Sequence, residues 1–224
     1  MNTRLRSVYD SLQSSNLDSF LNNEIGLDDM SGKHIWGMLL IVILQEEVKK
    51  SVQKFQEELE KLEPGNFSFP TYKSLHLTIN QVVHGLENAP AANQHVWDSI
   101  KSNFLPKFEA LNNAFSKIDI TFSKLIATKG GIIWCATDEN DEVEELRKKL
   151  MEVLPFPKEL IKENHIIHTT IARYKNKLND PQKVLDFIKS QNQKVAMAME
   201  EISLRNELVF PSKEVQDIAK IELK

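Results

Sequence analysis

The chain has 224 residues, enough for one large domain or two small lobes around a sizeable core. Hydrophobic residues make up 41% and charged residues 27%, and these ordinary values exclude a disordered chain, a collagen and a coiled-coil rod. The 28 basic and 32 acidic residues give a net charge of −4, which excludes a protein that coats nucleic acid through bulk charge but allows a local phosphate pocket.

The first 33 residues form a segment of their own. Leu5, Val8 and Leu12 recur at helical spacing, and a polar stretch rich in Asp and Asn follows them. Two interpretations are open: a short amphipathic helix packed on the main domain, or a partly ordered arm. We therefore divide the chain into a leader over residues 1–33 and a bilobal domain over residues 34–224.

The first half of this domain has the pattern strand, helix, strand. Residues 35–44 form a continuous apolar run, typical of a strand covered on both faces. Residues 46–62 carry apolar side chains at every third or fourth position, which predicts an amphipathic helix ended by a Pro-Gly pair. A short alternating strand is predicted over residues 75–79, and a helix that Pro106 kinks or splits over residues 93–111.

The second half repeats this plan after a tight Gly-Gly turn. The predicted elements are strands over residues 118–123, 132–137, 166–172 and 201–208, and helices over residues 141–154 and from Pro181 onward. In each half an apolar strand, an amphipathic helix and a second strand follow one another. This weak duplication predicts an α+β protein of two lobes related by pseudo-symmetry.

The strand that ends each unit carries the same polar motif, His-x-Thr. Because side chains alternate along a strand, His76 shares one face with Thr78, about 7 Å away, and His168 likewise shares one face with Thr170. If the lobes pack with these faces opposed, the four side chains line one polar cleft. A lone motif would more often be structural, but two copies in matched phase favour a functional site.

The chemistry available to these four groups is narrow. Two imidazoles with pKa values near 6.5 can divide the roles of base and acid at neutral pH. Two hydroxyls can donate to phosphate oxygens without adding negative charge. Neither motif contains a carboxylate for a metal or glycosidase site, so we expect no metal and no cofactor. The reaction that uses all four groups is acid–base attack on a phosphodiester in a neutral cleft.

At this point the sequence resembles the 2H phosphoesterases, which include RNA 2′,3′-cyclic phosphodiesterases once called 2′-5′ RNA ligases. The resemblance rests on His76-Leu77-Thr78, on residues 168–173 with their His-x-Thr-x-x-Arg pattern, and on residues 201–205, which are similar to the family's closing strand. It covers roughly residues 35–210. It implies a bilobal α+β fold with two antiparallel sheets flanking a central cleft and helices on the outside.

By this resemblance, His76 and His168 are general base and general acid, in an order that the sequence leaves open, and Thr78 and Thr170 bind the phosphate. The implied activity is metal-independent hydrolysis of a 2′,3′-cyclic phosphate or a related 2′-linked or cyclic nucleotide phosphodiester. We expect a cytoplasmic monomer that takes a nucleotide or RNA terminus and does not contact membranes. Two alternatives stay open: a non-catalytic module that binds nucleotides or RNA ends, and a structural protein whose paired motifs are coincidental.

The roles of the two residues after the second motif depend on strand geometry. Alternation places Arg173 with Ile171 rather than with His168, so Arg173 reaches the cleft only if the strand ends or bends after Ala172. Otherwise it caps a surface carboxylate. Tyr174 has the same parity as His168 and would stack on a base or pack at the rim.

Several other residues are assigned on local pattern alone. Cys135, the single cysteine, has apolar neighbours and is expected as a buried strand thiol. The basic run at residues 147–149 is expected on a solvated helix face, and His84 has no partner at metal-binding spacing. After Thr78 the chain departs from the family, because Asn80 and Gln81 stand where an apolar run is expected. This departure bears on the substrate.

Overall fold

The computed structural model describes residues 2–86, 88–157 and 165–224. The helices are α1 (Thr3–Leu21), α2 (Glu46–Leu62), α3 (Pro90–Glu109), α4 (Glu142–Val153) and α5 (Pro181–Ser190). The strands are β1 (His34–Ile43), β2 (Phe67–Ser68), β3 (His76–Val83), β4 (Ile118–Thr128), β5 (Gly131–Thr137), β6 (Ile167–Tyr174), β7 (Val195–Met199), β8 (Glu201–Val209) and β9 (Glu214–Glu222). In this part of the chain, no helix is both long and apolar enough to cross a bilayer.

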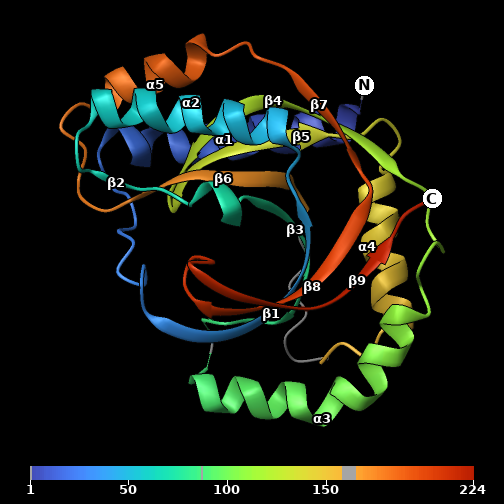
Figure 1. The fold of residues 1–224 in the computed structure, drawn as a ribbon. Helices are drawn as coiled ribbons and strands as arrows, with labels where there is room; N and C mark the ends of the chain where they lie inside the picture. The colour runs from blue at the N-terminus through green and yellow to red at the C-terminus, as the bar shows by residue number, and fades with distance from the viewer. Residues whose placement is uncertain (1, 87, 158–164) are drawn as a thin grey trace.

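The strands form two antiparallel sheets, with helices on the outside (Figure 1). One sheet has four strands in the order β3-β1-β8-β9, and the other has five strands in the order β2-β6-β5-β4-β7. The two motif strands, β3 and β6, lie in different sheets and contact each other. The predicted α+β class, with two antiparallel sheets and outer helices, is therefore confirmed.

The helix of each duplicated unit crosses to the opposite sheet. α2 follows β1 but packs against β6 and β7, where the ring of Phe55 meets that of Trp134 edge-on at 5.0 Å between centroids. α4 follows β5 but contacts β3 of the four-stranded sheet. The duplicated units are therefore not themselves the lobes, since each unit lends its helix to the other lobe (Figure 1).

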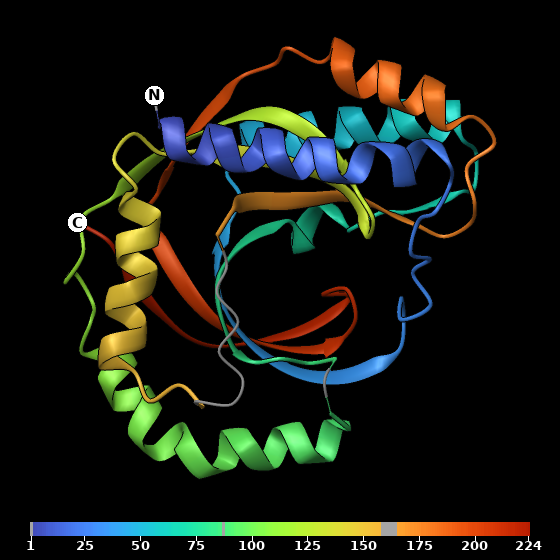
Figure 2. The ribbon, with the colours of Figure 1, turned by 180° about the vertical axis from the view of Figure 1, so that it is seen from behind.

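The first helix belongs to the five-stranded lobe. α1 packs on β4 and β5 and lies across the outer side of this sheet (Figure 2). Its buried residues are Leu5, Tyr9 and Phe20. The Tyr9 hydroxyl donates to the carbonyl of Ala136 at 2.5 Å and accepts from the amide of Ile167 at 3.1 Å, so it links β5 to β6. Residues 3–21 are therefore a helix packed on the main domain, which is the first of the two interpretations.

The helices were predicted more accurately than the strands near the C-terminus were. α2 has the bounds that its periodicity predicts, and its buried stripe includes Val48, Val52, Phe55 and Leu59. α3 continues through Pro106 without being split and covers the four-stranded sheet from outside. The sequence patterns missed β7 and β9, which form the outer edges of the two sheets.

Candidate functional site

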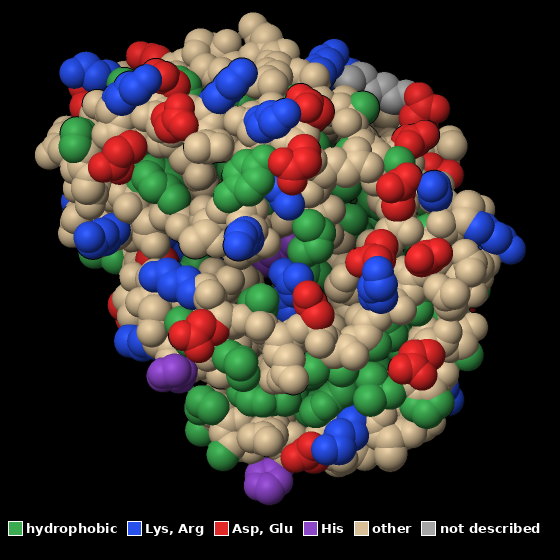
Figure 3. Space-filling view, viewed as in Figure 1, with side chains coloured by type: hydrophobic (Ala, Val, Ile, Leu, Met, Phe, Trp, Pro, Cys, Tyr) green, Lys and Arg blue, Asp and Glu red, His purple; other side chains and the backbone are tan. Residues whose placement is uncertain are grey.

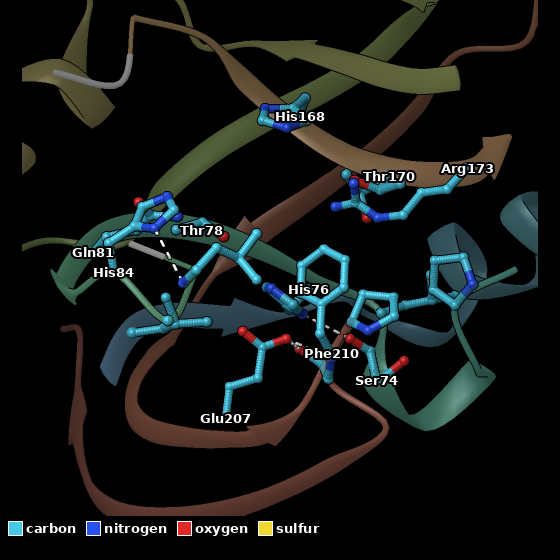
Figure 4. Close-up of a pocket in the computed structure, with 18 residues that line it drawn as sticks. Ser74, His76, Thr78, Gln81, His84, His168, Thr170, Arg173, Glu207 and Phe210 are labelled. Atoms are coloured by element: carbon cyan, nitrogen blue, oxygen red, sulfur yellow. Dashed lines mark hydrogen bonds between the residues drawn. The ribbon is translucent and has the colours of Figure 1, made fainter. Parts of the chain in front are cut away.

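A pocket of about 400 Å³ lies between the two sheets and contains both motifs. His76 and Thr78 reach it from β3, and His168 and Thr170 reach it from β6 (Figure 4). The volume is within the range of small-molecule binding sites. In the space-filling view, histidine and basic side chains lie inside the hollow between the two halves (Figure 3). The structure thus places the four motif residues around one pocket.

A bulge in β6 changes which side chains enter this pocket. Ile133 of β5 pairs with Thr170, but the adjacent Ile132 pairs with Ala172, so Ile171 is an extra residue in β6. An extra residue shifts the alternation of side chains by one position. Every residue after the bulge therefore points to the face opposite the one that strict alternation predicts.

The bulge exchanges the faces expected for Arg173 and Tyr174. Arg173 lines the pocket, where its guanidinium lies 4.7 Å from the ring centroid of Phe210. The Nε atom of Arg173 is buried and has no hydrogen-bond partner among the described residues. Tyr174 is instead fully buried against Phe20, and its hydroxyl donates to the carbonyl of Thr128 at 3.0 Å. The expectation that Tyr174 stacks on a base or packs at the rim is therefore wrong.

The first motif strand carries a bulge at the equivalent position. Ile41 of β1 pairs with Thr78, and the adjacent Leu40 pairs with Asn80, so Ile79 is the extra residue in β3. Gln81, the second residue after the bulge, consequently lines the pocket. Strict alternation would have placed it on the opposite face from the motif.

A side chain from each crossing helix binds the carbonyl of a bulge. Gln56 of α2 donates through Nε2 to the carbonyl of Ile171 at 3.1 Å. Arg147 of α4 donates through Nε to the carbonyl of Ile79 at 2.9 Å. A bulge disrupts the strand ladder, and buried carbonyls outside a ladder need other donors. The pseudo-symmetry therefore extends from the motifs to the groups that support them.

Arg147 also connects the two motif strands. Its Nη2 donates to the carbonyl of Thr78 at 3.1 Å and to that of Ile166, directly before β6, at 3.0 Å. Its side chain is buried, so the expected solvated face is wrong for this residue, while Lys148 and Lys149 are exposed. Burial lowers the pKa of Arg147 to about 10, which leaves it cationic at neutral pH.

The two histidines differ in their hydrogen bonds. Nδ1 of His76 lies 2.7 Å from the carbonyl of Ser74 and must donate to it, which leaves Nε2 as an acceptor. Nδ1 of His168 is buried without a partner among the described residues. Burial lowers the pKa of His76, and burial together with the charge of Arg147 lowers the pKa of His168 to about 4. Both rings are therefore neutral at pH 7 until an anion enters.

The pocket wall from β8 and the turn that follows it was not foreseen from the sequence. Glu207 accepts from the backbone amide and the hydroxyl of Ser212, and burial raises the pKa of its carboxyl group. Phe210 lies beside it in the wall. The lining thus contains the carboxyl group of Glu207 and the guanidinium of Arg173 as well as the histidines and threonines. We had expected a cleft lined by neutral groups alone. Recognising β9 in the sequence could have located this wall, because Glu207 lies near the end of β8 and Phe210 and Ser212 lie in the turn between β8 and β9.

Of the other residues assigned from the sequence, His84 lies in the pocket and Cys135 lies in the core. His84 lines the pocket, with the backbone amide of Leu86 donating to its Nδ1 at 3.4 Å, although its sequence spacing gave no sign of this. Cys135 is a buried free thiol whose pKa is raised by burial, which confirms the expected strand cysteine. Across residues 2–86, 88–157 and 165–224, no group of three His, Cys, Asp or Glu side chains is arranged to hold a metal ion.

Comparisons with known proteins identify the fold. No protein-family model and no curated protein sequence matches the chain. The apo structure of LigT from Escherichia coli matches with a TM-score of 0.57 at 8% identity, over 86% of this chain and 99% of that one. TT0787 of Thermus thermophilus matches with a TM-score of 0.54 at 14% identity, over 84% of this chain and 97% of that one.

A third solved structure extends over nearly the whole chain. It is a conserved protein of unknown function, ATU0111 from Agrobacterium tumefaciens str. C58, with a TM-score of 0.57 at 9% identity, covering 98% of this chain and 99% of that one. At such identities the likeness shows the fold alone. The chain therefore has the LigT fold, and the resemblance to the 2H phosphoesterases that its two His-x-Thr motifs indicate is confirmed at the level of the fold.

Proposed function

We propose that the protein hydrolyses a 2′,3′-cyclic phosphate or a related 2′-linked or cyclic nucleotide phosphodiester. The observation that carries this proposal is the meeting of both His-x-Thr motifs in one pocket, from strands of two different sheets. Two buried polar atoms there, Nδ1 of His168 and Nε of Arg173, lack protein partners among the described residues. A bound anion would supply the missing acceptors and would raise the pKa of both histidines.

The reaction needs only proton transfers and donors to the phosphate. One histidine takes a proton from water as the water oxygen attacks phosphorus. The phosphorus–oxygen bond to one ribose oxygen then breaks, and the other histidine gives that oxygen its proton. The hydroxyls of Thr78 and Thr170 and the guanidinium of Arg173 line the pocket where the non-bridging oxygens would carry the developing charge.

The hydrogen bond at Ser74 favours one order of roles. Because Nδ1–H of His76 is held by this carbonyl, the Nε2 lone pair of His76 is oriented for accepting a proton. His76 therefore suits the base. Nδ1 of His168 has no such carbonyl partner among the described residues, and entry of an anion would raise the pKa of this ring and favour its protonated form, which suits the acid.

One solved relative of the fold guides the choice of ligands. LigT of Escherichia coli has been solved with phosphate and with 3′-AMP, and these structures match the chain with TM-scores of 0.55 and 0.56. Phosphate and a nucleoside monophosphate are therefore the first binding probes to use.

The test is a substrate panel in the presence of EDTA. It contains the four nucleoside 2′,3′-cyclic phosphates, a 2′-5′-linked dinucleotide and an ADP-ribose-type phosphodiester, with products identified by chromatography. We expect conversion of at least one member to a phosphomonoester at a rate that EDTA does not change. Tight binding in calorimetry without product from any member would instead support the non-catalytic nucleotide-binding module.

A further inference from the structure

The two motifs are longer than His-x-Thr. One strand continues with Ile79, Asn80 and Gln81, and the other with Ile171, Ala172 and Arg173, so both read His-x-Thr-Ile-x followed by a long polar side chain. The bulge falls on the isoleucine in both strands. Because each bulge shifts the alternation by one residue, it turns the sixth motif residue into the pocket. Gln81 and Arg173 are therefore equivalent positions.

These two side chains reach the pocket from opposite walls. Gln81 comes from the four-stranded sheet, and Figure 4 shows it with His84 on one side of the histidine pair. Arg173 comes from the five-stranded sheet and lies with Thr170 on the other side. A phosphate held between His76 and His168 therefore has one of these two residues on each side.

The two sides of the pocket differ in the charge of their side chains. Arg173 is the one Lys or Arg among the described residues that line the pocket, so the anionic oxygens are best accommodated on its side. The labelled residues beside Gln81 in Figure 4 are His84 and Thr78, and Leu39 pairs with Gln81 between β1 and β3, so no Lys or Arg of the described lining lies on this side. This side therefore suits a neutral part of the substrate.

The amide of Gln81 is free to bind a ligand. The side chain is half-buried, and it hydrogen-bonds to no other residue in the described part of the chain. A primary amide both donates and accepts. This matches the neutral groups of a nucleoside, namely ribose hydroxyls and the edge of a base, and the amide adds no positive charge to offset a second phosphate.

We propose that Gln81 binds the nucleoside of the substrate, on the side of the phosphate opposite Arg173. The proposal rests on the proposed function and adds which residue recognises the neutral part of the substrate. It also accounts for the polar residue after the first motif, at a position where the family resemblance led us to expect an apolar one.

The test compares wild type with Gln81→Leu, which keeps the side-chain size and removes both hydrogen-bonding groups. We expect kcat/KM on the preferred nucleoside 2′,3′-cyclic phosphate to fall about 3- to 10-fold, the value of one or two neutral hydrogen bonds. The Kd for inorganic phosphate, measured by calorimetry, is expected to stay unchanged. Gln53→Leu, an exposed residue of α2, is the matched control and is expected to have no effect.

Two further arms identify the group that Gln81 binds. If it binds a base edge, Gln81→Leu reduces the differences in kcat/KM among the four bases and spares the base-free ribose 2′,3′-cyclic phosphate. If it binds a ribose hydroxyl, the base-free substrate loses as much as the others. An unchanged kcat/KM on every substrate, or an equal loss of affinity for inorganic phosphate, would overturn the proposal.

Failure of the proposed function has a different signature. If wild type turns over no member of the panel, the catalytic proposal fails, and the role of Gln81 is decided by calorimetry with 3′-AMP. Tighter binding of 3′-AMP than of inorganic phosphate, lost in Gln81→Leu, would still support nucleoside recognition. Equal binding of 3′-AMP by the two proteins, or no binding, would overturn it.

Discussion

His168 combines burial with a positively charged neighbourhood. Its pKa is about 4 because burial disfavours the imidazolium and because Arg147, His76 and Arg173 add to this effect. The unfolded chain, with an ordinary pKa near 6.5, takes up a proton first as the pH falls. The neutral ring therefore contributes stability above pH 6.5, and this contribution is lost as the pH falls toward 4.

This linkage predicts a pH-dependent difference between wild type and His168→Asn. Between pH 6.5 and 4.5, the free energy of unfolding of wild type should fall more steeply, by up to about 1.4 kcal/mol per pH unit. Urea unfolding at several pH values measures both proteins, and the difference between them isolates this residue from the other titrating groups. Parallel pH profiles would show that His168 is not held neutral by the fold.

At the scale of strands, the bulge in β6 depends on a glycine in the neighbouring strand. Gly131 has φ +152°, and a Cβ atom there would lie 2.3 Å from the carbonyl oxygen of Ala172. Ala172 lies between the bulge and Arg173. A side chain at residue 131 would therefore displace the segment that directs Arg173 into the pocket.

Gly131→Ala is expected to destabilise the protein by about 2 kcal/mol and to weaken phosphate binding. Gly130→Ala is the matched control, since a Cβ atom there would meet nothing within 4 Å. Thermal unfolding and phosphate calorimetry on the two variants check this. If the two glycines tolerate alanine equally well, the bulge does not depend on Gly131.

A second prediction at this scale concerns Arg147 of α4, whose side chain connects the two motif strands. Arg147→Met leaves the carbonyls of Thr78, Ile79 and Ile166 without this donor. We expect a loss of about 3 kcal/mol in unfolding free energy, because buried polar groups are left unpaired. Removing the cation should also raise the pKa of His168 toward 6.5.

The pKa of His168 shows whether Arg147 acts on this histidine through its charge or only supports the fold. Urea unfolding gives the stability, and NMR titration of the imidazoles gives the pKa of His168. Lys148→Met removes the same charge at an exposed neighbouring position and should change neither quantity. A His168 pKa that stays at its wild-type value in folded Arg147→Met would refute the electrostatic part of the account.

The limits of sequence reasoning are also visible at this scale. Periodicity predicted the bounds of α2 because that helix depends on its own apolar stripe. Alternation predicted the shared faces of His76 with Thr78 and of His168 with Thr170, but it failed after each threonine. The bulges there depend on partners distant in sequence, such as Gln56 at Ile171, which no local pattern reveals. The same holds for the wall around Glu207.

At the scale of the whole molecule, the lobes are held together by the exchanged helices α2 and α4, while α1 packs within the five-stranded lobe. α2 and α4 each pack on the sheet opposite to their own strands, and α1 covers β4 and β5 (Figures 1 and 2). Motion of one lobe against the other would therefore disturb the contacts that hold both bulges. This predicts one cooperative unfolding transition rather than two.

Tyr9 tests whether α1 belongs to this cooperative unit. Tyr9→Phe removes the hydroxyl that bonds to the carbonyl of Ala136 and the amide of Ile167, at the start of β6. We expect a loss of about 1–3 kcal/mol, with a single transition retained in urea. Tyr72→Phe, which removes a hydroxyl bonded to the exposed Glu46, serves as the control and should cost less. A Tyr9→Phe variant as stable as wild type would place α1 outside the cooperative unit.

The central claim is that His76 and His168 act together as the acid–base pair. The most direct measurement is kcat/KM of His76→Ala, His168→Ala and the double variant on the best substrate of the panel, with the exposed His95→Ala as control. The account predicts a loss of about 10²- to 10⁴-fold for each single variant, a double variant little worse than either, and an unchanged control. Near-wild-type turnover in either motif variant would contradict it.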